Sequence, residues 1–440
     1  MTTLKAIRGT RDLLPPESAL WNRIEATARS VFARYHFGEI RTPLFEDTAL
    51  FARSVGEETD IVSKEMYTWE DRARAQSEKT QSLTLRPENT AGVVRAYIEH
   101  QLGETGQLQK LYYIGPQFRR ERPQKGRYRQ FSQIGAEVIG PTSTGSESPL
   151  RDAEVLEMLA TLLNQLGISG WTLQLNSVGS QADRARYNEV LRTALDPVAS
   201  RMCVDCQRRA LTNPLRVLDC KVPEDQPIID ALPKISESLD EESKKHFAAV
   251  LAALDASGVP YTRNHRLVRG LDYYTRTTFE FTHGGLGAQN ALVGGGRYDG
   301  LSEAIGGPKA PGIGFAMGED RLVLTLLAQQ ANQVPASKAD AFIAPLGDAK
   351  DEAKLTAINA AALSLARELR HTGLRIELGD GSFRLKKSFE AADKTARAIV
   401  ILGEDELQSG ILTVKTFSTG VQTKVARGTL ATFLTNLPLD

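Results

Sequence analysis

The stretch from Leu111 to Gly140 constrains the fold of this chain more than any other. It reads as two β-strands joined by a loop, and successive residues of a strand point to opposite faces. On the second strand, one face carries small or aliphatic residues, Ile134, Ala136 and Val138. The other face carries Phe131, Gln133, Gly135 and Glu137. The pattern predicts a rigid hairpin that packs on one face and displays functional groups on the other.

The loop of this hairpin is strongly basic. Beside a single acid, Glu121, it holds Arg119, Arg120, Arg122, Lys125, Arg127 and Arg129. This density favours a polyanion such as a triphosphate, an RNA end, or both. Phe131 offers a surface on which a base can stack, and Gly135 is expected to leave a gap where a ligand approaches the sheet. A merely solvated polar face is the alternative interpretation.

The whole chain, at 440 residues, exceeds one typical core and predicts a multidomain α+β protein. One helix should begin at Glu17 and another at Pro149, each with an apolar face at helical spacing. Strands are expected at Trp171–Leu175 and Thr277–Phe281. Between them, the stretch from about Ser177 to Gly258 looks helical, and we interpret it as an insertion between strands of one sheet.

A polar linker at residues 331–338 is predicted to separate a first domain, residues 1–330, from a second, residues 339–440. In the second domain strands and helices alternate, beginning with a strand at Phe342–Ala344 and a helix from Asp351 to His371. Such alternation over roughly 100 residues predicts a small α/β domain with a mixed sheet.

Several classes of protein are excluded by composition and motifs. The 54 basic and 54 acidic residues cancel, so binding to nucleic acid or a membrane would need a local patch. There is no run of about 18 apolar residues that would span a membrane, and the polar beginning is unlike a signal peptide, so we expect a cytoplasmic protein. The sequence contains no P-loop, no H-E-x-x-H and no G-x-S-x-G motif.

Three cysteines form the pattern Cys203-x-x-Cys206 with Cys220 downstream. Three thiols could hold zinc if a fourth ligand, such as a distant histidine, joined them. Because no second C-x-x-C is present, the usual ligand count is unmet. We therefore interpret these residues as buried structural cysteines and expect no zinc.

Three further segments carry chemistry. Glu88 and Thr90 lie on a turn at the start of a helix, which suits an ammonium group, although plain helix capping is the alternative. The stretch Leu267–Tyr274 brings Arg269 beside two adjacent tyrosines. In Gly312–Arg321, glycines lead into a helix that contains Arg321, for which a solvated arginine is the alternative.

Together these segments resemble the class II aminoacyl-tRNA synthetases, and among them the histidyl-tRNA synthetase family. Gly38–Pro43 is similar to motif 1, Phe118–Pro123 with its hairpin to motif 2, and Gly312–Arg321 to motif 3. Leu267–Tyr274 and Gly294–Asp299 are similar to the histidine-binding segments. The resemblance implies an antiparallel sheet flanked by helices, with a helical insertion and a C-terminal anticodon-binding domain.

The resemblance also implies a two-step reaction in which L-histidine and ATP, with Mg²⁺, form histidyl-adenylate before transfer to a histidine-specific tRNA. The implied ATP-binding residues are Arg119, Arg127, Phe131 and Arg321, with Arg119 and Arg269 acting on the α-phosphate. Phe131 would stack on adenine, with Arg321 on the other face of the base.

Histidine itself would be bound through Glu88, Thr90 and Gln133 at its α-ammonium group, and through Glu137, Tyr273 and Tyr274 around the imidazole. The tRNA acceptor stem would meet Arg122 and Gln124, and motif 1 implies a homodimer. No membrane partner is expected.

One residue departs from the family pattern. Asn89 stands where the family commonly has glycine in the Arg-Pro-Glu-Gly-Thr turn. Because asparagine tolerates left-handed backbone better than most residues, we expect the turn to survive.

Two rival functions belong to the same fold. One is the histidine-binding regulatory subunit of ATP phosphoribosyltransferase, and the other is a class II synthetase for a different amino acid. The presence of Arg119, Arg269, Arg321 and a C-terminal domain argues against the first. Glu137 beside Tyr273–Tyr274 argues against an apolar substrate.

Overall fold

The computed structural model describes residues 3–56, 59–71, 80–124, 126–286, 290–329, 338–348 and 350–438. Its internal contacts divide the chain into two units, Met1–Val334 and Pro335–Asp440. Lys125 and nearly all of the predicted linker at 331–338 lie outside the described residues. Within the described residues, no helix is both long and apolar enough to span a bilayer.

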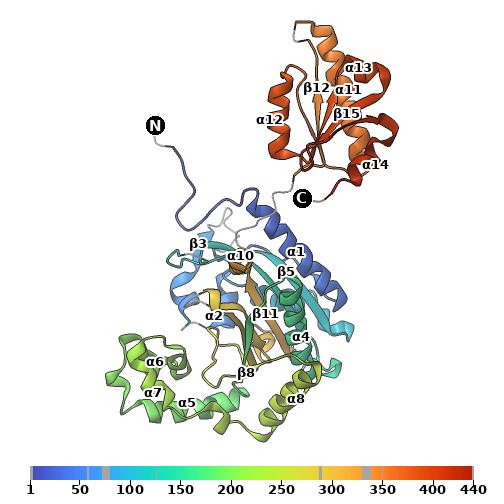
Figure 1. Ribbon diagram of the computed structural model, residues 1–440. Coiled ribbons are helices and arrows are strands. Elements are labelled where there is room, and N and C mark those ends of the chain that lie inside the picture. The colour runs from blue at the N-terminus through green and yellow to red at the C-terminus, as the bar shows by residue number, and fades with distance from the viewer. Residues whose placement is uncertain are drawn as a thin grey trace. The chain divides into compact units, whose positions relative to one another are not determined.

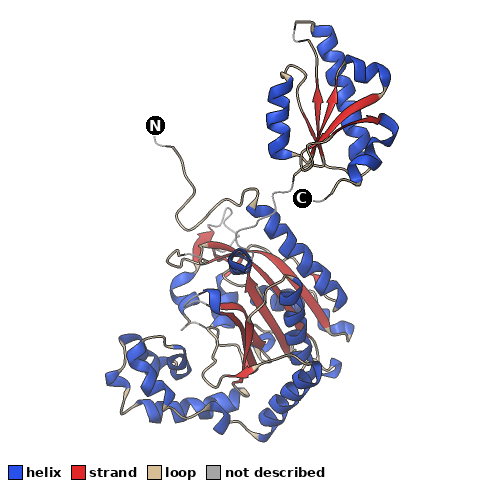
Figure 2. Ribbon diagram, in the orientation of Figure 1, coloured by secondary structure: helices blue, strands red, loops and turns tan. Residues whose placement is uncertain are grey.

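The first unit is built around a large sheet (Figures 1 and 2). Among the described residues it has eight strands, in the order β1 (Gly38–Glu39), β5 (Gln109–Phe118), β6 (Gln130–Ile139), β11 (Gly312–Gly318), β10 (Ala291–Arg297), β9 (Thr275–His283), β7 (Trp171–Ser177) and β8 (Thr262–Arg263). All neighbours are antiparallel except the short edge pairs β1–β5 and β7–β8. The predicted hairpin is the β5–β6 pair, in register from Gln109 opposite Ile139 to Phe118 opposite Gln130.

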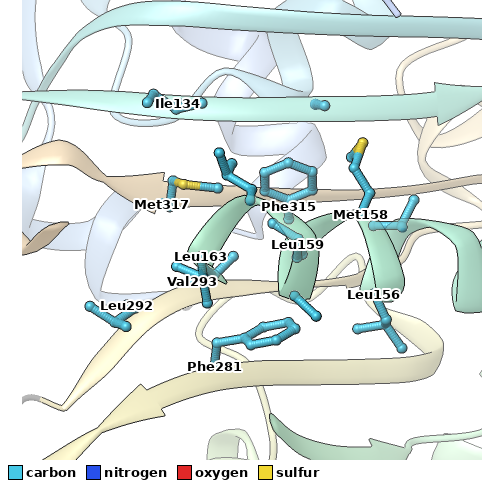
Figure 3. Packing of buried hydrophobic residues seen from close by; sticks show 14 of the residues in the cluster. Ile134, Leu156, Met158, Leu159, Leu163, Phe281, Leu292, Val293, Phe315 and Met317 are labelled. Atoms are coloured by element: carbon cyan, nitrogen blue, oxygen red, sulfur yellow. The ribbon is translucent and has the colours of Figure 1, made fainter. Parts of the chain in front are cut away.

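One face of this sheet is buried under helices α1 (Glu17–Arg34), α4 (Pro149–Gln165), α8 (Glu241–Ser257) and α10 (Glu319–Gln329). Helix α4 begins as predicted, because the Ser148 side chain accepts a hydrogen bond from the backbone N–H of Leu150 at 3.3 Å and Pro149 occupies the first turn. In Figure 3, its residues Leu159 and Leu163 lie against strands β11 and β10. This packing fixes the sheet from one side and leaves the other face free for a site.

The first unit also contains a smaller sheet and three helices that accompany it. Among the described residues this sheet has the order β2 (Phe45–Asp47), β4 (Gln81–Leu85) and β3 (Tyr67–Asp71). The accompanying helices are α2 (Thr48–Val55), α3 (Thr90–Glu99) and α9 (Leu301–Ala304). They share a second apolar cluster with Tyr273, Tyr274 and Tyr298. Helix α3 begins beside strand β6, where the Thr90 hydroxyl donates to the Glu137 carboxylate at 2.7 Å, directly after the turn that the sequence singles out.

The helical insertion lies between β7 and β9, which pair directly in the large sheet. Its helices are α5 (Gln181–Leu195), α6 (Val204–Thr212) and α7 (Gln226–Asp230), and these share their own apolar core with the 3₁₀ turn η5 (Pro214–Asp219). Helix α8, which the sequence grouped with the insertion, instead packs Phe247, Val250 and Leu254 into the core of the large sheet. The separate body of the insertion thus ends before Glu241.

The second unit is an α/β domain with a mixed sheet, as predicted. Within the part of it that the structure describes, the strand order is β13 (Ile376–Leu378), β12 (Ala341–Pro345), β14 (Ala398–Leu402), β15 (Ile411–Thr416) and β16 (Gln422–Ala426). Its helices are α11 (Glu352–His371), α12 (Leu385–Thr395), α13 (Glu404–Ser409) and α14 (Leu430–Thr435). Strand β16 and the short helices α13 and α14 are additions that the sequence did not predict.

A buried ion pair holds the end of strand β10. Arg297 and Asp152 are both 0% exposed, and the guanidinium donates to the Asp152 carboxylate at 2.5 Å and to the Ser146 carbonyl at 2.7 Å. Asp299 accepts from Nε of Arg297 at 3.1 Å. Arg297 therefore anchors helix α4 to the sheet, away from the cavity described below.

The Arg297→Met variant should lower the free energy of unfolding of the first unit by about 3–5 kcal/mol, because it leaves the Asp152 carboxylate buried without its cation. The measurement is urea denaturation followed by tryptophan fluorescence, since all three tryptophans, Trp21, Trp69 and Trp171, lie in this unit. Lys244→Met, which breaks an exposed pair with Glu241, is the control and should change stability by less than about 1 kcal/mol. Equal losses in the two variants would contradict the role of Arg297.

Candidate active site

A cavity of about 460 Å³ opens on the free face of the large sheet. Its walls come from β5, β6, β9, β10 and β11, from the β5–β6 loop, and from the segment before β9. Predicted site residues on its walls are Glu88, Thr90, Arg119, Arg127, Phe131, Gln133, Arg269, Tyr273, Tyr274 and Arg321. Chain segments that are far apart in sequence thus meet in one concave site of the size that small ligands occupy.

One end of the cavity is rich in cations. Arg119, Arg127 and Arg321 line it together. Burial lowers the pKa of Arg321, and the charges of Arg127 and Arg119 lower it further. Glu121 partly compensates, because its Oε2 lies 3.0 Å from Nε of Arg127 and its Oε1 lies 3.8 Å from the guanidinium of Arg119. Such a gathering of guanidinium groups suits a ligand that carries several negative charges.

An aromatic surface lies beside these cations. The guanidinium of Arg119 lies over the Phe131 ring, 5.2 Å from its centroid, and Nε of Arg119 donates to the Pro87 carbonyl at 2.8 Å. Arg119 is therefore held between the turn before α3 and strand β6. A flat apolar ring next to fixed cations provides the two contacts that a nucleotide needs.

The turn before α3 holds a buried carboxylate. Glu88 accepts hydrogen bonds from the backbone N–H groups of Thr90 at 2.8 Å and Ala91 at 3.0 Å. The capping interpretation is therefore realised, although Glu88 also lines the cavity. Burial raises the pKa of Glu88, and the two backbone donors oppose that rise.

Asn89 stabilises this turn by a different route from the one expected. Its φ is −121°, so no left-handed backbone is required there. Its side-chain oxygen accepts from Thr42 Oγ1 at 2.6 Å and from Arg86 at 3.1 Å. Arg86 donates further to the Pro116 carbonyl at 2.9 Å and to the Thr42 carbonyl at 3.1 Å. The asparagine is therefore part of a network that joins the motif 1 stretch, the turn and strand β5.

Glu137 lies beneath the cavity wall rather than on it. It is 0% exposed, and its carboxylate accepts from Thr90 Oγ1 at 2.7 Å and from the Tyr113 hydroxyl at 3.5 Å. Burial raises the pKa of Glu137 to about 8, with Thr90 and other hydroxyl donors opposing the rise and Glu88 adding to it. Burial therefore favours the protonated form of this carboxyl group at neutral pH.

On strand β6, Gln133 is the polar residue that lines the cavity. Its side-chain oxygen is buried and has no hydrogen-bond partner among the described residues. Because a buried acceptor without a donor is costly, this amide is placed to receive a hydrogen bond from a ligand.

Arg269 occupies a space that glycine provides. A side chain at Gly294 would overlap the Arg269 guanidinium, which therefore lies flat on strand β10. The guanidinium forms an ion pair with Glu280 of strand β9, and the Arg269 carbonyl accepts from Arg216 of the insertion at 3.2 Å. Gly295 and Gly296 similarly accommodate Phe279 and Tyr274. The triple glycine thus fixes a cation and a tyrosine on the sheet.

Gly135 does not leave the ligand gap that the sequence suggested. It lies opposite Tyr113 in the β5–β6 register, and a side chain there would overlap the Tyr113 ring and the Phe315 carbonyl. The glycine makes room for a tyrosine that itself lines the cavity. The expectation of a gap was wrong because cross-strand neighbours fill the space over a small residue.

Arg122 and Gln124 lie apart from the cavity. Both are exposed in the β5–β6 loop, and Gln124 exchanges backbone hydrogen bonds with Arg127 at 3.1 and 2.9 Å. The two residues are therefore available to a macromolecule rather than to a ligand inside the cavity.

Sequence reasoning missed three residues of the site. Glu280 lies on strand β9 between Phe279 and Phe281, which are both buried in the core. Because successive residues of a strand face opposite sides, strand alternation alone could have identified Glu280 as a residue of the cavity face. Asp320 lines the cavity and accepts from Arg11 at 2.8 Å, a contact between ends of the first unit that no local pattern reveals. Tyr113 of strand β5 also lines the cavity.

The family comparisons agree with this geometry. A model described as "Histidyl-tRNA synthetase" matches residues 9–322, and one described as "Anticodon binding domain" matches residues 340–437. The histidine–tRNA ligase of Koribacter versatilis is 69% identical over 434 residues, which cover 98% of this chain and 96% of the relative. The chain belongs to the histidyl-tRNA synthetase family.

Two more histidyl-tRNA synthetases extend the comparison. The histidine–tRNA ligase of Solibacter usitatus is 54% identical over 97% of this chain and 98% of its own length. The crystal structure of the apo S. aureus enzyme is 37% identical, with a TM-score of 0.77 over 98% of this chain and 100% of that one. The predicted family and the predicted class II synthetase fold are therefore confirmed.

Gly294→Ala should displace the Arg269 guanidinium while leaving the fold intact, because the overlapping atoms are the mobile end of a long side chain. We expect the histidine-dependent ATP–pyrophosphate exchange typical of this family to fall about 100-fold, which is what a misplacement of about 1 Å near a reacting centre can cost. Gly284→Ala, whose added methyl group would meet nothing within 4 Å, is the control. Unchanged exchange in the Gly294→Ala variant would show that the position of the Arg269 guanidinium does not affect the exchange reaction.

Proposed function

We propose that this chain is a histidine–tRNA ligase that works in two steps. L-Histidine first attacks the α-phosphate of ATP, forming histidyl-adenylate and releasing pyrophosphate. The 3′-terminal ribose of tRNA then takes the histidyl group and releases AMP. The observation that carries this proposal is the convergence of guanidinium groups, an aromatic ring and a buried carboxylate on one cavity, in a chain 69% identical to a histidine–tRNA ligase.

For ATP, we assign Arg119 and Arg269 to the α-phosphate, and Arg127 and Arg321 to the β- and γ-phosphates. Displacement at phosphorus depends on positioning and charge stabilisation, and fixed guanidinium groups supply both. The contact of Arg119 with the Pro87 carbonyl and Phe131 supports its role as a fixed cation. Adenine would stack on Phe131, with Arg321 on the other face of the base.

Mg²⁺ fits this cavity. Glu121 and Glu280 place carboxylate oxygens on its wall, and Mg²⁺ is usually bound by one or two carboxylates together with substrate phosphates. The bound ion would neutralise phosphate charge. Glu121 and Glu280 also pair with Arg127 and Arg269, so they hold these guanidinium groups in fixed positions on the cavity wall.

For histidine, we assign Glu88, Thr90 and Gln133 to the α-ammonium group, and Glu137, Tyr273 and Tyr274 to the imidazole. The unpartnered oxygen of Gln133 supports the first assignment. Glu137 reaches the pocket through Thr90 and Tyr113, which both touch it and line the cavity. A site that is built on such hydrogen bonds discriminates strongly against side chains that cannot form them.

For tRNA, we assign residues 1–330 to catalysis, 331–338 to a linker and 339–440 to anticodon binding, as the family matches support. Arg122 and Gln124 would meet the acceptor stem, and their exposure on the β5–β6 loop supports this role. Single-stranded anticodon loops are readable by such small domains.

A homodimer through the motif 1 region is also proposed. Leu44 and Phe45 beside Pro43 are 43% and 52% exposed, and Trp69, which packs edge-on against Phe45, is 41% exposed. An exposed apolar group of this kind favours burial against another protein surface.

The test of the proposed function is ATP–pyrophosphate exchange across all twenty amino acids without tRNA, followed by charging of histidine tRNA. Exchange with histidine alone supports the function. Exchange with another amino acid would overturn the imidazole assignment, and histidine binding without exchange would favour the regulatory subunit.

Glu137→Gln should reduce kcat/KM for histidine by about 10- to 150-fold, the worth of a hydrogen bond to a charged group. The amide is close in shape to the protonated carboxyl group that burial favours, so the variant should fold normally. ATP binding, measured separately by calorimetry, should hardly change. Equal losses for histidine and ATP would contradict the assignment of Glu137 to the imidazole.

The pKa of about 8 for Glu137 also predicts a pH dependence. We propose that its proton stays in the site and is shared with the imidazole, whose free pKa is about 6.5. Between about pH 6.5 and about pH 8, the separated protein and histidine together carry as many of these protons as their complex does. The Kd for histidine should therefore be constant in this range. Above pH 8 binding must take up a proton, so affinity should fall by about tenfold per unit.

Calorimetry across pH 6.5–8.5, in buffers of different ionisation enthalpy, checks this linkage. Release of one proton at pH 7 would instead show that neutral imidazole binds the ionised carboxylate. The Glu137→Gln variant is the control, because its profile should lose the decline above pH 8.

A further inference from the structure

Three thiols and one carboxylate meet in the insertion, remote in sequence from the catalytic motifs. They belong to Cys203, Cys206, Cys220 and Asp225, and their potential ligand atoms all lie within 4.8 Å of one another. The two outer cysteines flank helix α6 and turn η5, while Asp225 precedes helix α7. The fourth ligand that the cysteine pattern lacked is therefore present, as an aspartate rather than a histidine.

The spacing of these atoms is that of a tetrahedral metal site. Sγ of Cys203 lies 3.9 Å from Sγ of Cys220, and Sγ of Cys220 lies 3.3 Å from Oδ2 of Asp225. A Zn–S distance of about 2.3 Å places two thiolates of a tetrahedron about 3.8 Å apart. These two separations are thus close to those that a bound Zn²⁺ would impose on its ligand atoms.

The backbone around the cysteines is arranged to support thiolates. The N–H of Cys206 donates to Sγ of Cys203, and the N–H of Val222 donates to Sγ of Cys220, both at 3.4 Å. Hydrogen bonds of this kind orient the ligands of metal sites from the outside. They would be weak and incidental contacts for neutral thiols, since a thiol sulfur is a poor acceptor.

Asp225 is the member of the cluster that argues most strongly for a bound metal. It is 1% exposed, and it accepts from the Cys203 N–H at 3.0 Å and from Sγ of Cys220. Among the described residues no lysine or arginine forms an ion pair with it. Buried carboxylates are normally paired with a cation or bound to a metal. A purely apolar cluster of cysteines gives no reason for a carboxylate here.

We propose that Cys203, Cys206, Cys220 and Asp225 bind one structural Zn²⁺ ion. Three thiolates and one carboxylate oxygen are ligand types that zinc accepts, and four protein ligands leave no position open for catalysis. This proposal replaces the expectation of buried cysteines without metal.

The ion would stabilise the part of the insertion that touches the catalytic cavity. Asp219 and Lys221, on either side of Cys220, line that cavity. In the preceding turn, Arg216 donates to the Arg269 carbonyl at 3.2 Å and Asn213 donates to Asp272 at 3.1 Å. Metal binding at Cys220 would therefore hold the segment that supports Arg269.

The first test is the metal content of the full-length protein, purified under reducing conditions without chelator and measured by inductively coupled plasma mass spectrometry. We expect about one zinc per chain. Protein stripped of metal should bind Co²⁺ and show the thiolate charge-transfer and tetrahedral d–d absorption bands. No zinc and no cobalt spectrum, or a Cys203–Cys220 disulfide in the freshly purified protein, would overturn the proposal.

Variants separate a ligand from a packing residue. Cys206→Ser and Asp225→Ala should weaken zinc binding by more than the roughly 100-fold that loss of an outer partner costs. Asp225→Cys should retain zinc, because it supplies a fourth thiolate. Asp205→Asn is the matched control, since its side chain lies inside the C-x-x-C stretch but is 70% exposed. Retention of zinc by Cys206→Ser and Asp225→Ala would contradict the assignment.

Metal content and metal spectra do not depend on enzyme activity, so this proposal and the proposed function fail separately. Removal of zinc should raise KM for histidine or ATP through Arg269, with the fold of the large sheet preserved.

Discussion

The alternation of strand β6 is the constraint on which the rest of the first unit depends. Ile134, Ala136 and Val138 pack into the core on one face. Phe131 and Gln133 consequently point into the cavity on the other face, and Glu137 lies just beneath it. Because both sets are on one strand, any displacement of the core would move the site as well. The hydrophobic packing under α1 and α4 thus provides the preorganisation that phosphoryl chemistry requires.

The cavity contains carboxylates that balance the charge of its guanidinium groups. Arg127 pairs with Glu121 and Arg269 pairs with Glu280, so the guanidinium groups remain in fixed positions without a phosphate. Burial nevertheless raises the pKa of Glu88 and Glu137, whereas burial and the neighbouring charge of Arg127 lower the pKa of Arg321. The site therefore favours a ligand that is anionic at one end and can share the proton of a buried carboxyl group at the other.

The sequence predicted the elements of the site well, because strand alternation and helix caps are local. The β5–β6 hairpin, the start of α4 and the cluster of arginines all follow from neighbouring residues. Contacts between distant segments could not be predicted in this way. The filling of the space at Gly135 by Tyr113 depends on the register of two strands. The role of Asn89 depends on Thr42, which is 47 residues away.

The Arg86 network connects the region proposed for dimerisation to the site. Arg86 and Asn89 hold Thr42 of the motif 1 stretch against the turn that contains Glu88. If two chains pair through this stretch, each of them stabilises the other's ammonium-binding turn. Catalytic competence would then obey mass action, and a lone chain in dilute solution would be a poorer enzyme than the same chain in a concentrated one.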